Sequence, residues 1–284
     1  MLPPHHTFSH EAMATTFSVF VAGVPAEYAR QAAAAAFREL DRLENELSRY
    51  VESSDIARAN RLAEGESLIL GEDALRCLLL ASRLSAATDR AFDPAYASLA
   101  PGRPFADQAL YALDPARHEL TSLTPRLHLD LGAIGKGYAL DCMADLLREW
   151  TLTEVCLQSG GSTALALAPP AGLAGWPVGL GEGDSYRSLL LRDRALSGSG
   201  VAVQGAHVID VRRGQPAQRQ TRTWAFAADA ASSDALSTAF FVMIDDAVEA
   251  FCRRHPEYGA GVTAADGTVR LLGAIDPPDT PLHP

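Results

Sequence analysis

Residues 127–150 read LHLDLGAIGKGYALDCMADLLREW, a stretch with the pattern of a strand, a turn and a helix. Its first five residues, 127–131, alternate between apolar and polar as a β-strand does. A glycine-rich turn follows at 132–137, and apolar residues at helical spacing predict a helix from about Tyr138 to Trp150. Glycines let a ligand approach the backbone closely, and the start of a helix offers unpaired N–H groups and the positive end of the helix dipole. With the ammonium of Lys136, this turn predicts a binding site for an anion.

This turn has two alternative interpretations. A phosphate-binding P-loop needs GxxxxGK followed by Ser or Thr, whereas Gly137 follows the lysine here, so a P-loop is rejected. A purely structural strand-to-helix turn with an exposed lysine stays open. Lys136 is the only lysine in the sequence, and every other basic residue is arginine. A GC-rich genome, which favours arginine codons, explains the arginines. The single lysine is then either there by coincidence or present because the site needs its compact ammonium.

The composition excludes several classes of protein. The chain has 284 residues, of which 48% are hydrophobic and 21% are charged, as in ordinary globular proteins. Its net charge of −11 gives no general attraction for nucleic acid or for anionic membranes, so neither is expected as a partner. A phosphate-bearing ligand would therefore need local positive charge, from a metal, a helix N-terminus or a few chosen side chains.

The sequence also predicts a compartment. No stretch approaches the roughly 18 consecutive apolar residues of a transmembrane helix. The start, MLPPHHTFSHEAMATTF, lacks a basic segment followed by an apolar run, so no signal peptide is expected and the protein is predicted to be cytoplasmic. The four cysteines show no CxxC spacing and are predicted to be buried free thiols: Cys77, Cys142, Cys156 and Cys252.

Hydrophobic periodicity predicts an α+β fold with an antiparallel sheet and several long helices. Helices are expected at 26–47, 73–87 and 245–254, with a loop and short helix in 48–60, and another helix that begins near Ser232, Ser233 or Asp234. Strands are expected at 17–23 and 154–158, with several short strands between 176 and 230, and a hairpin that turns at Asp266 and Gly267. Residues 102–118 are expected to form a loop.

A second motif of interest is SDALST at 233–238. Asp234 and Thr238 are four residues apart, so on a helix they share a face and can offer two oxygens to one small ion. A carboxylate and a hydroxyl, completed by carbonyls and waters, suit Mg²⁺. The alternative is an N-capping Asp and a Thr that is hydrogen-bonded to a backbone carbonyl, and for this motif alone that alternative is preferred.

Three weaker segments complete the candidates. In HVID, His207 can act as a general base near neutral pH, but an edge strand with polar residues explains this segment equally well. The segments TDRAFDP at 88–94 and QSGG at 158–161 are each ordinary loops when taken alone.

Taken together and in order, eight segments resemble the ApbE family, the FAD:protein FMN transferases. They are MAT at 13–15, the SRY of 48–50 with Ser54, Ile56 and Asn60, TDRAFDPA at 88–95, DLGAIGKGYALD at 130–141, GGS at 160–162, SG at 197–198, HVID at 207–210 and DALSTA at 234–239. The segments at 130–141 and 234–239 are the most specific. The resemblance implies one ApbE-like (T-fold-like) domain of two intertwined lobes over residues 1–284, with a Pro-rich tail after residue 276.

The resemblance also implies an activity. ApbE-family proteins bind FAD and Mg²⁺, transfer FMN through a phosphoester bond to a Thr or Ser of an acceptor protein, and release AMP. By motif position, Asp234, Thr238 and the backbone carbonyl of Ala133 would hold Mg²⁺, while Lys136 would supply positive charge and His207 would help to deprotonate the acceptor hydroxyl. The residues expected to line the FAD pocket are Met13, Tyr50, Phe92, Asp93, Lys136, Gly160 and Gly161.

This chain departs from the family pattern at several positions. Ala14 and Arg90 replace glycines, Ser162 replaces an aspartate, and VRRG follows Asp210 where the family has Pro-x-Thr-Gly. Two further functions therefore stay open beside FMN transfer. One is hydrolysis of FAD to FMN and AMP, and the other is a non-catalytic flavin-binding or structural role.

Overall fold

Eight strands form the largest sheet in the part of the chain that the computed structural model describes, which is residues 4–98, 108–180, 186–200, 209–210, 215–217, 221–264, 267–273 and 275. In spatial order they are β1 (His5–Ala12), β2 (Thr15–Ala22), β6 (Val155–Ser159), β7 (Thr163–Ala166), β10 (Arg194–Ser199), β13 (Thr223–Ala227), β14 (Gly259–Thr263) and β15 (Val269–Gly273). All neighbouring pairs are antiparallel, which confirms the predicted α+β class with an antiparallel sheet.

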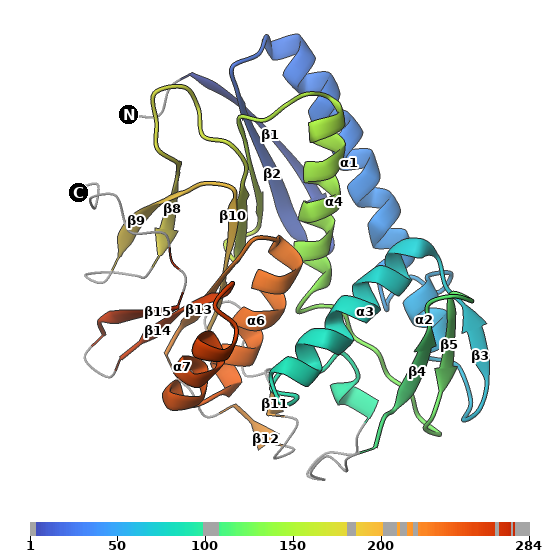
Figure 1. Ribbon diagram of the computed structural model, residues 1–284. Helices are drawn as coiled ribbons and strands as arrows, with labels where there is room; N and C mark the ends of the chain where they lie inside the picture. Colours follow the sequence, from blue (N-terminus) through green and yellow to red (C-terminus); the bar gives the residue numbers. More distant parts are fainter. Residues whose placement is uncertain are drawn as a thin grey trace.

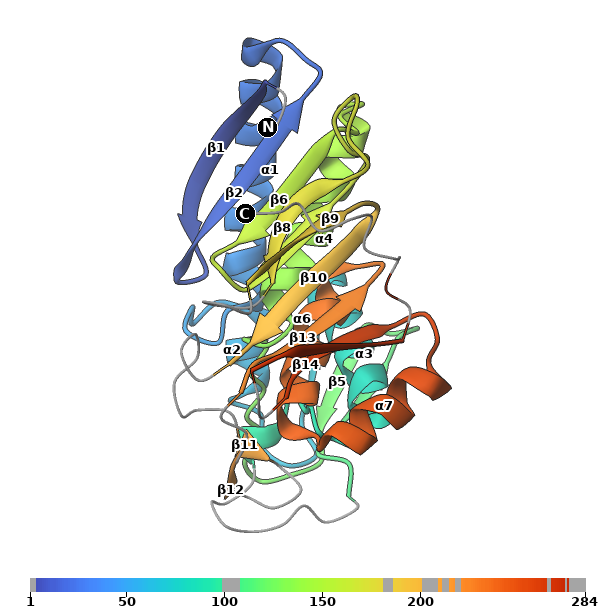
Figure 2. The same cartoon turned by 90° about the vertical axis from the view of Figure 1, so that its left-hand side faces the viewer.

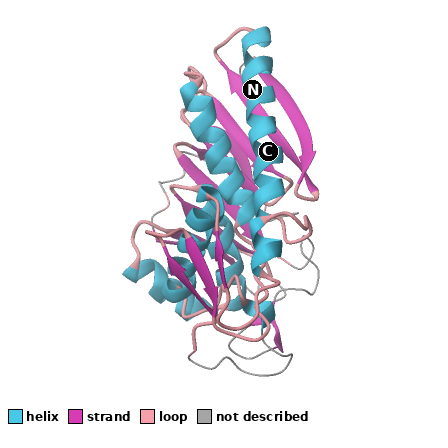
Figure 3. Cartoon of the chain, turned by 90° about the vertical axis from the view of Figure 1, so that its right-hand side faces the viewer, coloured by secondary structure: helices cyan, strands magenta, loops and turns pink. Residues whose placement is uncertain are grey.

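A layer of helices covers one face of this sheet (Figures 1 and 3). It contains α1 (Ala26–Leu47), α4 (Gly135–Glu149) and α6 (Ala230–Val242), while α7 (Asp245–Arg254) packs on β14 and β15. Alternate strand residues, such as Val19 and Leu157, are fully buried beneath these helices. The helix-facing side of the sheet and its helical layer form the main hydrophobic core.

The opposite face of the sheet has a smaller core of its own. A hairpin of β8 (Trp176–Leu180) and β9 (Arg187–Leu191) lies over this face (Figure 2). Trp224 and Phe226 of β13 are 5% and 2% exposed and belong to the same apolar cluster as Trp176 of the hairpin. The sheet is therefore covered by helices on one side and partly by a hairpin on the other.

A second group of elements lies at one end of the helical layer (Figure 1). A three-stranded sheet of β3 (Ser67–Ile69), β5 (Glu119–Ser122) and β4 (Tyr111–Asp114) lies near α2 (Asp55–Ala59). The long helix α3 (Glu72–Ala87) connects this group to the main core through contacts with α1 and α6. The remaining described elements are the 3₁₀ turn Tyr96–Ser98 and the short pair β11 (Ile209–Asp210) and β12 (Gln215–Pro216).

None of the described helices combines the length and the apolar character that a membrane crossing requires.

Most predicted elements are confirmed. The helices at 26–47 and 245–254 have the predicted bounds, α3 begins one residue earlier than expected, and the hairpin of β14 and β15 is present. All four cysteines are free, although Cys142 is only partly buried. The prediction of a loop over 102–118 is wrong for residues 111–114, which pair with β5 as β4, while residues 102–107 lie outside the described part of the chain.

The predicted strand at 127–131 is wrong, although its alternating burial is real. Leu127, Leu129 and Leu131 are buried, but their segment joins no sheet. The side chain of Asn60 takes the place of a neighbouring strand, because its amide accepts from the Leu129 N–H at 2.6 Å and donates to the Leu129 carbonyl at 2.9 Å. The backbone N–H and carbonyl of Leu129 are thus satisfied without a ladder.

Two helix starts also differ from the prediction. The helix expected from Tyr138 begins at Gly135, so that Lys136 and Gly137 lie in its first turn. The helix that carries the SDALST motif begins at Ala230, and its N-cap is Asp229, whose carboxylate accepts from the Ser232 N–H at 2.7 Å. Asp234 is consequently an interior helix residue and not a capping one.

Candidate functional site

The candidate site forms where the first turn of α4 meets the start of α6. Gly137 makes this approach possible, because a Cβ at this position would lie 2.2 Å from the carbonyl oxygen of Ala230. The Gly137 N–H donates to Oδ2 of Asp234 at 3.2 Å. The glycine-rich turn therefore contacts the SDALST helix, although the two lie about a hundred residues apart in the sequence.

Lys136 and Asp234 form an ion pair at this contact. The Lys136 Nζ lies 3.5 Å from Oδ2 of Asp234, and it donates to the carbonyl oxygen of Gly132 at 2.6 Å. The Asp234 side chain is only 4% exposed and that of Lys136 is 18% exposed. The structure thus brings together two residues that sequence reasoning placed in one site.

Two hydroxyl groups of the sheet form a hydrogen-bonded chain that ends at Asp234. Thr163 of β7 donates to Oδ1 of Asp234 at 3.5 Å, and Ser197 of β10 donates to the Thr163 hydroxyl at 3.1 Å. These two residues are paired across the sheet and were missed from the sequence, because nothing local links β7 to β10. Ser159 is their neighbour in β6, and its buried hydroxyl has no partner among the described residues.

Thr238 lies one helical turn beyond Asp234 and joins a second set of hydroxyls. Its Oγ1 is 3.4 Å from the hydroxyl of Ser199, which is also 2.9 Å from that of Ser237. α6 is buried almost throughout, so these polar side chains need partners inside the protein. Neighbouring strands supply such partners to the face of α6 that carries Asp234.

Asp141 links α4 to the N-terminus of α6 by hydrogen bonds. Its carboxylate on α4 accepts from the N–H groups of Ala230 and Ala231 at 2.7 and 2.8 Å, at the N-terminus of α6. Burial raises the pKa of Asp141 to about 7, and the nearby charge of Asp229 adds to this, while the two backbone hydrogen bonds act against it. The sequence motif included this residue without giving it a role.

The donor set at this contact fits a hard divalent cation. Carboxylate, hydroxyl and backbone carbonyl oxygens are the ligands that Mg²⁺ prefers. Asp234 and Thr238 supply the first two, and Ala133 belongs to the turn whose Gly132 carbonyl already accepts from an ammonium ion. The described residues contain no cluster of three or more His, Cys, Asp or Glu, and a site with one carboxylate does not require such a cluster.

A polar network extends from the glycine-rich turn to Tyr50. Asp130 accepts from the Gly132 N–H at 2.9 Å, and its other oxygen is 3.2 Å from both Arg49 Nη1 and the Tyr96 hydroxyl. The guanidinium of Arg49 lies over the ring of Tyr50 at 4.7 Å, and Tyr50 is 79% exposed. Tyr50 therefore offers an accessible aromatic surface that is linked to the turn.

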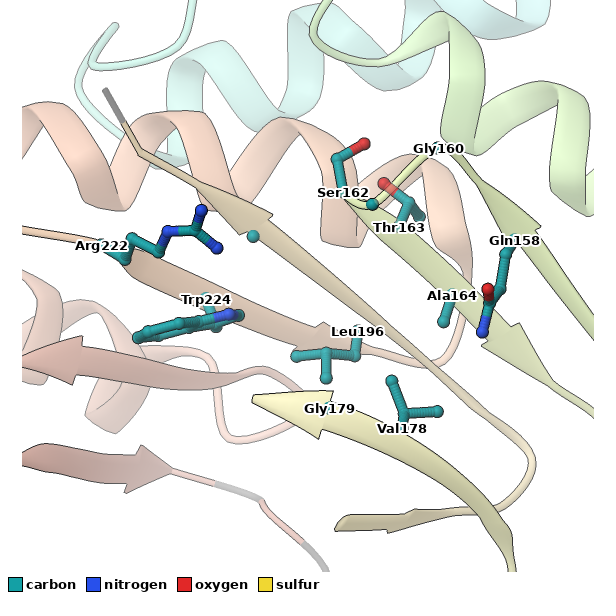
Figure 4. A pocket seen from close by; sticks show the side chains of 12 residues that line it. Gln158, Gly160, Ser162, Thr163, Ala164, Val178, Gly179, Leu196, Arg222 and Trp224 are labelled. Carbon is teal, nitrogen blue, oxygen red and sulfur yellow. The ribbon is translucent and has the colours of Figure 1, made fainter. Parts of the chain in front are cut away.

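A pocket of about 200 Å³ opens beside the GG segment, on the hairpin side of the sheet (Figure 4). Gly160 lies at one side of it, and Arg222 and Trp224 lie at another. Gly161 also belongs to its lining. Gly160 has a φ of +52° and a Cβ there would lie 2.5 Å from the Thr15 hydroxyl, so a glycine is needed for both reasons. Its complete lining is Gln158, Gly160, Gly161, Ser162, Thr163, Ala164, Val178, Gly179, Leu196, Gly198, Arg222 and Trp224.

A second hollow, of about 740 Å³, lies beside the Arg49 network. Its basic lining residues are Arg61, Arg126 and His128, and the His128 ring nitrogen is 3.2 Å from Arg49 Nη1. The two hollows lie on different elements, since β7, β10, β13 and the hairpin line the first and the segments around Asn60 and 124–128 line the second.

The sequence model of the ApbE family matches residues 13–262. The chain belongs to the ApbE family. The flavin transferase ApbE from Vibrio cholerae has a similar structure, with 18% identity, coverage of 95% of this chain and 98% of that chain, and a TM-score of 0.82. The flavinyl transferase ApbE from Pseudomonas stutzeri is similar at 21% identity, with 97% and 96% coverage and a TM-score of 0.81.

The ApbE protein from Thermotoga maritima is similar at 22% identity, with 95% and 97% coverage and a TM-score of 0.80. At these identities the likeness establishes the shared fold. No curated protein sequence matches the chain.

The chain departs from the ApbE sequence pattern at two tight turns. Ala14, where the pattern has glycine, has a φ of +59° and follows Met13 with a φ of +49° in the two-residue turn between β1 and β2. Arg90, at the second glycine position, has a φ of +60°. Residues with a Cβ are strained in this left-handed region, so both turns keep a glycine conformation without the glycine.

Arg90 does not project away from its own turn. Its Nε donates to Oδ2 of Asp93 at 2.7 Å, and a second guanidinium nitrogen also binds that carboxylate. The other Asp93 oxygen accepts from the Ala95 N–H, and Phe92 is 3% exposed within the main core. Two expected pocket residues, Phe92 and Asp93, are thus buried, and the carboxylate of Asp93 is already paired.

Met13, Ser162 and His207 are the other positions that the sequence singled out. The Met13 N–H donates to a carboxylate oxygen of Glu44 at 2.8 Å. Ser162, which stands where the ApbE pattern has aspartate, lines the smaller hollow. His207 lies outside the described residues, and the Asp210 of its motif is a buried residue of β11.

Proposed function

We propose that this ApbE-family chain is a Mg²⁺-dependent FAD:protein FMN transferase. It would move FMN from FAD to a Thr or Ser hydroxyl of an acceptor protein and release AMP. The observation that carries the proposal is the contact of α4 and α6, where Lys136 and Asp234 form a mostly buried ion pair amid hydroxyls. Two proteins with this fold, from Vibrio cholerae and Pseudomonas stutzeri, are flavin transferases by name, which supports the proposal.

The chemistry requires local positive charge in an acidic protein. The acceptor oxygen would attack the phosphorus of the FMN moiety, the bond from that phosphorus to the AMP oxygen would break, and His207 would take the proton of the hydroxyl. Asp234, Thr238 and the Ala133 carbonyl would hold Mg²⁺, which neutralises charge on the pyrophosphate when bound. Lys136 would add a second, mobile positive charge near the pyrophosphate.

The flavin would be held by residues around this centre. Tyr50 offers an exposed ring linked through Arg49 and Asp130 to the glycine-rich turn. Gly160 and Gly161 line the smaller hollow, whose Thr163 hydroxyl reaches Asp234. By motif position, Met13, Phe92 and Asp93 would complete the pocket.

A second candidate function is hydrolysis of FAD to FMN and AMP, with water in place of the acceptor hydroxyl. The same charged centre serves both reactions. The observation that favours hydrolysis is the change in the HVID segment, where VRRG follows Asp210 in place of the Pro-x-Thr-Gly of the ApbE pattern. The products separate the two reactions, because transfer leaves flavin bound covalently to a protein and hydrolysis leaves free FMN.

The test compares wild type with Asp234→Asn in an assay of AMP release from FAD with and without Mg²⁺. Loss of the carboxylate should lower the Mg²⁺-dependent rate by roughly 100-fold to 1,000-fold. Asp145→Asn is the matched control, because Asp145 lies on α4 with its side chain 75% exposed. Full Mg²⁺-dependent activity in Asp234→Asn would show that the metal assignment is wrong.

A further inference from the structure

The position of the Lys136 ammonium resembles the position expected for a bound cation. It bridges the Gly132 carbonyl at 2.6 Å and Oδ2 of Asp234 at 3.5 Å. A turn carbonyl and this carboxylate are also the kinds of oxygen that the proposed Mg²⁺ would use. We infer that Lys136 occupies the cation position in the metal-free protein, so that Mg²⁺ must displace its ammonium in order to bind.

The burial of Asp234 gives the first reason for such a placeholder. An ionised carboxylate that is 4% exposed is unfavourable without a positive partner. The Gly137 N–H at 3.2 Å and the Thr163 hydroxyl at 3.5 Å are neutral donors and do not balance its charge. Among the described residues, Lys136 forms the ion pair that does so.

Electrostatics gives the second reason. An ammonium and a divalent cation repel each other, and this repulsion is little screened at a site shielded from solvent. Contact of both cations with the same Asp234 oxygen is therefore unfavourable. Binding of Mg²⁺ would turn the lysine side chain outward, where it becomes free to contact a phosphate group.

The residue type gives the third reason. A lysine has one compact ammonium on a flexible stem, whereas arginine has a rigid planar fork that binds a carboxylate through two nitrogens. In a chain whose other basic residues are all arginine, the displaceable cation is the one lysine. The inference rests on the proposed function only in taking Asp234 as the metal ligand.

The single lysine also makes the inference testable without any flavin. Brief acetylation of the wild-type protein, with and without Mg²⁺ alone, is followed by mass spectrometry of the peptide that contains Lys136. We expect Mg²⁺ to raise the rate of acetylation at Lys136 by roughly tenfold, which corresponds to release of an interaction of about 1.4 kcal/mol. The α-amino group of the chain serves as the internal reference and should not change.

Asp234→Asn is the control for this measurement. Without the carboxylate, Lys136 should react at one rate whether or not Mg²⁺ is present. A rate at wild-type Lys136 that is unchanged or lowered by saturating Mg²⁺ would overturn the inference.

Mg²⁺ affinity gives an independent readout. Calorimetry should show that Lys136→Gln binds Mg²⁺ roughly tenfold more tightly than wild type, because a competing cation is removed. Lys136→Arg keeps a cation and should show no such gain. Equal or weaker binding by a folded Lys136→Gln would contradict the inference.

The two proposals fail in different ways. Mg²⁺-dependent release of AMP with Lys136 acetylation unaffected by Mg²⁺ would overturn the displacement and leave the proposed function in place. Release of Lys136 by Mg²⁺ without any turnover of FAD would support the displacement and contradict the proposed function.

Discussion

The contact between α4 and α6 and the tight turns at Met13–Ala14 and Asp89–Arg90 are built in opposite ways. At the contact, glycine stands where a side chain would collide, and each charge has a partner. At the turns, four residues with a Cβ adopt positive φ, and the glycines of the ApbE pattern are absent. The charged centre therefore depends on close packing, whereas the two turns accept local strain.

Substitution of Gly137 should lower the stability of the protein the most. Gly137→Ala would place a Cβ 2.2 Å from the Ala230 carbonyl oxygen and 2.8 Å from the Ala231 Cα, so the helices must separate. We expect the free energy of unfolding to fall by about 3 kcal/mol. Chemical denaturation measures this change.

Gly135→Ala is the matched control in the same helical turn. A Cβ there would meet Leu131 at an ordinary 3.6 Å, and alanine favours helix. A similar loss of stability in both variants would show that the close approach at Gly137 is not the cause.

The next effect concerns the pH dependence that Asp141 confers. Because its folded-state pKa is raised to about 7, the native protein holds a proton that the unfolded chain has lost. Its contribution to stability is full below about pH 4 and is lost as the pH rises through 7. Relative to Asp141→Asn, wild type should lose about 2 kcal/mol between pH 5 and pH 7.

Denaturation of both proteins across this pH range measures the difference. Comparison with Asp141→Asn removes the contributions of other titrating groups. A constant difference between the two proteins would show that burial does not raise the pKa of Asp141 in the folded protein.

A smaller effect is expected at Arg90. Arg90→Gly relieves a φ of +60° but removes the guanidinium partner of Asp93, whose side chain is 2% exposed. Loss of the ion pair should outweigh the relief, with a net destabilisation of about 1 kcal/mol. Thermal unfolding would show the sign, and an increase in stability would mean that the pair contributes little.

The smallest effect is expected at Ala14, where strain has no ion pair to offset it. Ala14→Gly should raise the free energy of unfolding by about 0.5 kcal/mol, because relief of the left-handed strain exceeds the entropy cost of glycine. Opposite signs for Ala14→Gly and Arg90→Gly in the same assay would separate strain from charge pairing. A loss of stability in Ala14→Gly would show that its turn is not strained.

Local pattern predicted the long elements well, because the buried stripes of α1 and α7 repeat at helical spacing within each segment. It failed at 127–131, where the partner of the extended backbone is the side chain of Asn60. It also missed Thr163 and Ser197, because their contact with Asp234 depends on sheet register and on helix packing over the sheet. Lys136, Asp234 and Thr238 were found because their motifs are specific, although the ion pair itself could not be predicted.

Residues at the α4–α6 contact would bind the phosphates of FAD. The most direct test of this proposal is a fluorescence titration of FAD with the purified protein, with and without Mg²⁺, followed by measurement of AMP in the same mixtures. We expect saturable binding of FAD that Mg²⁺ strengthens, and release of AMP only when Mg²⁺ is present. The absence of FAD binding at concentrations up to about 1 mM would contradict the proposal.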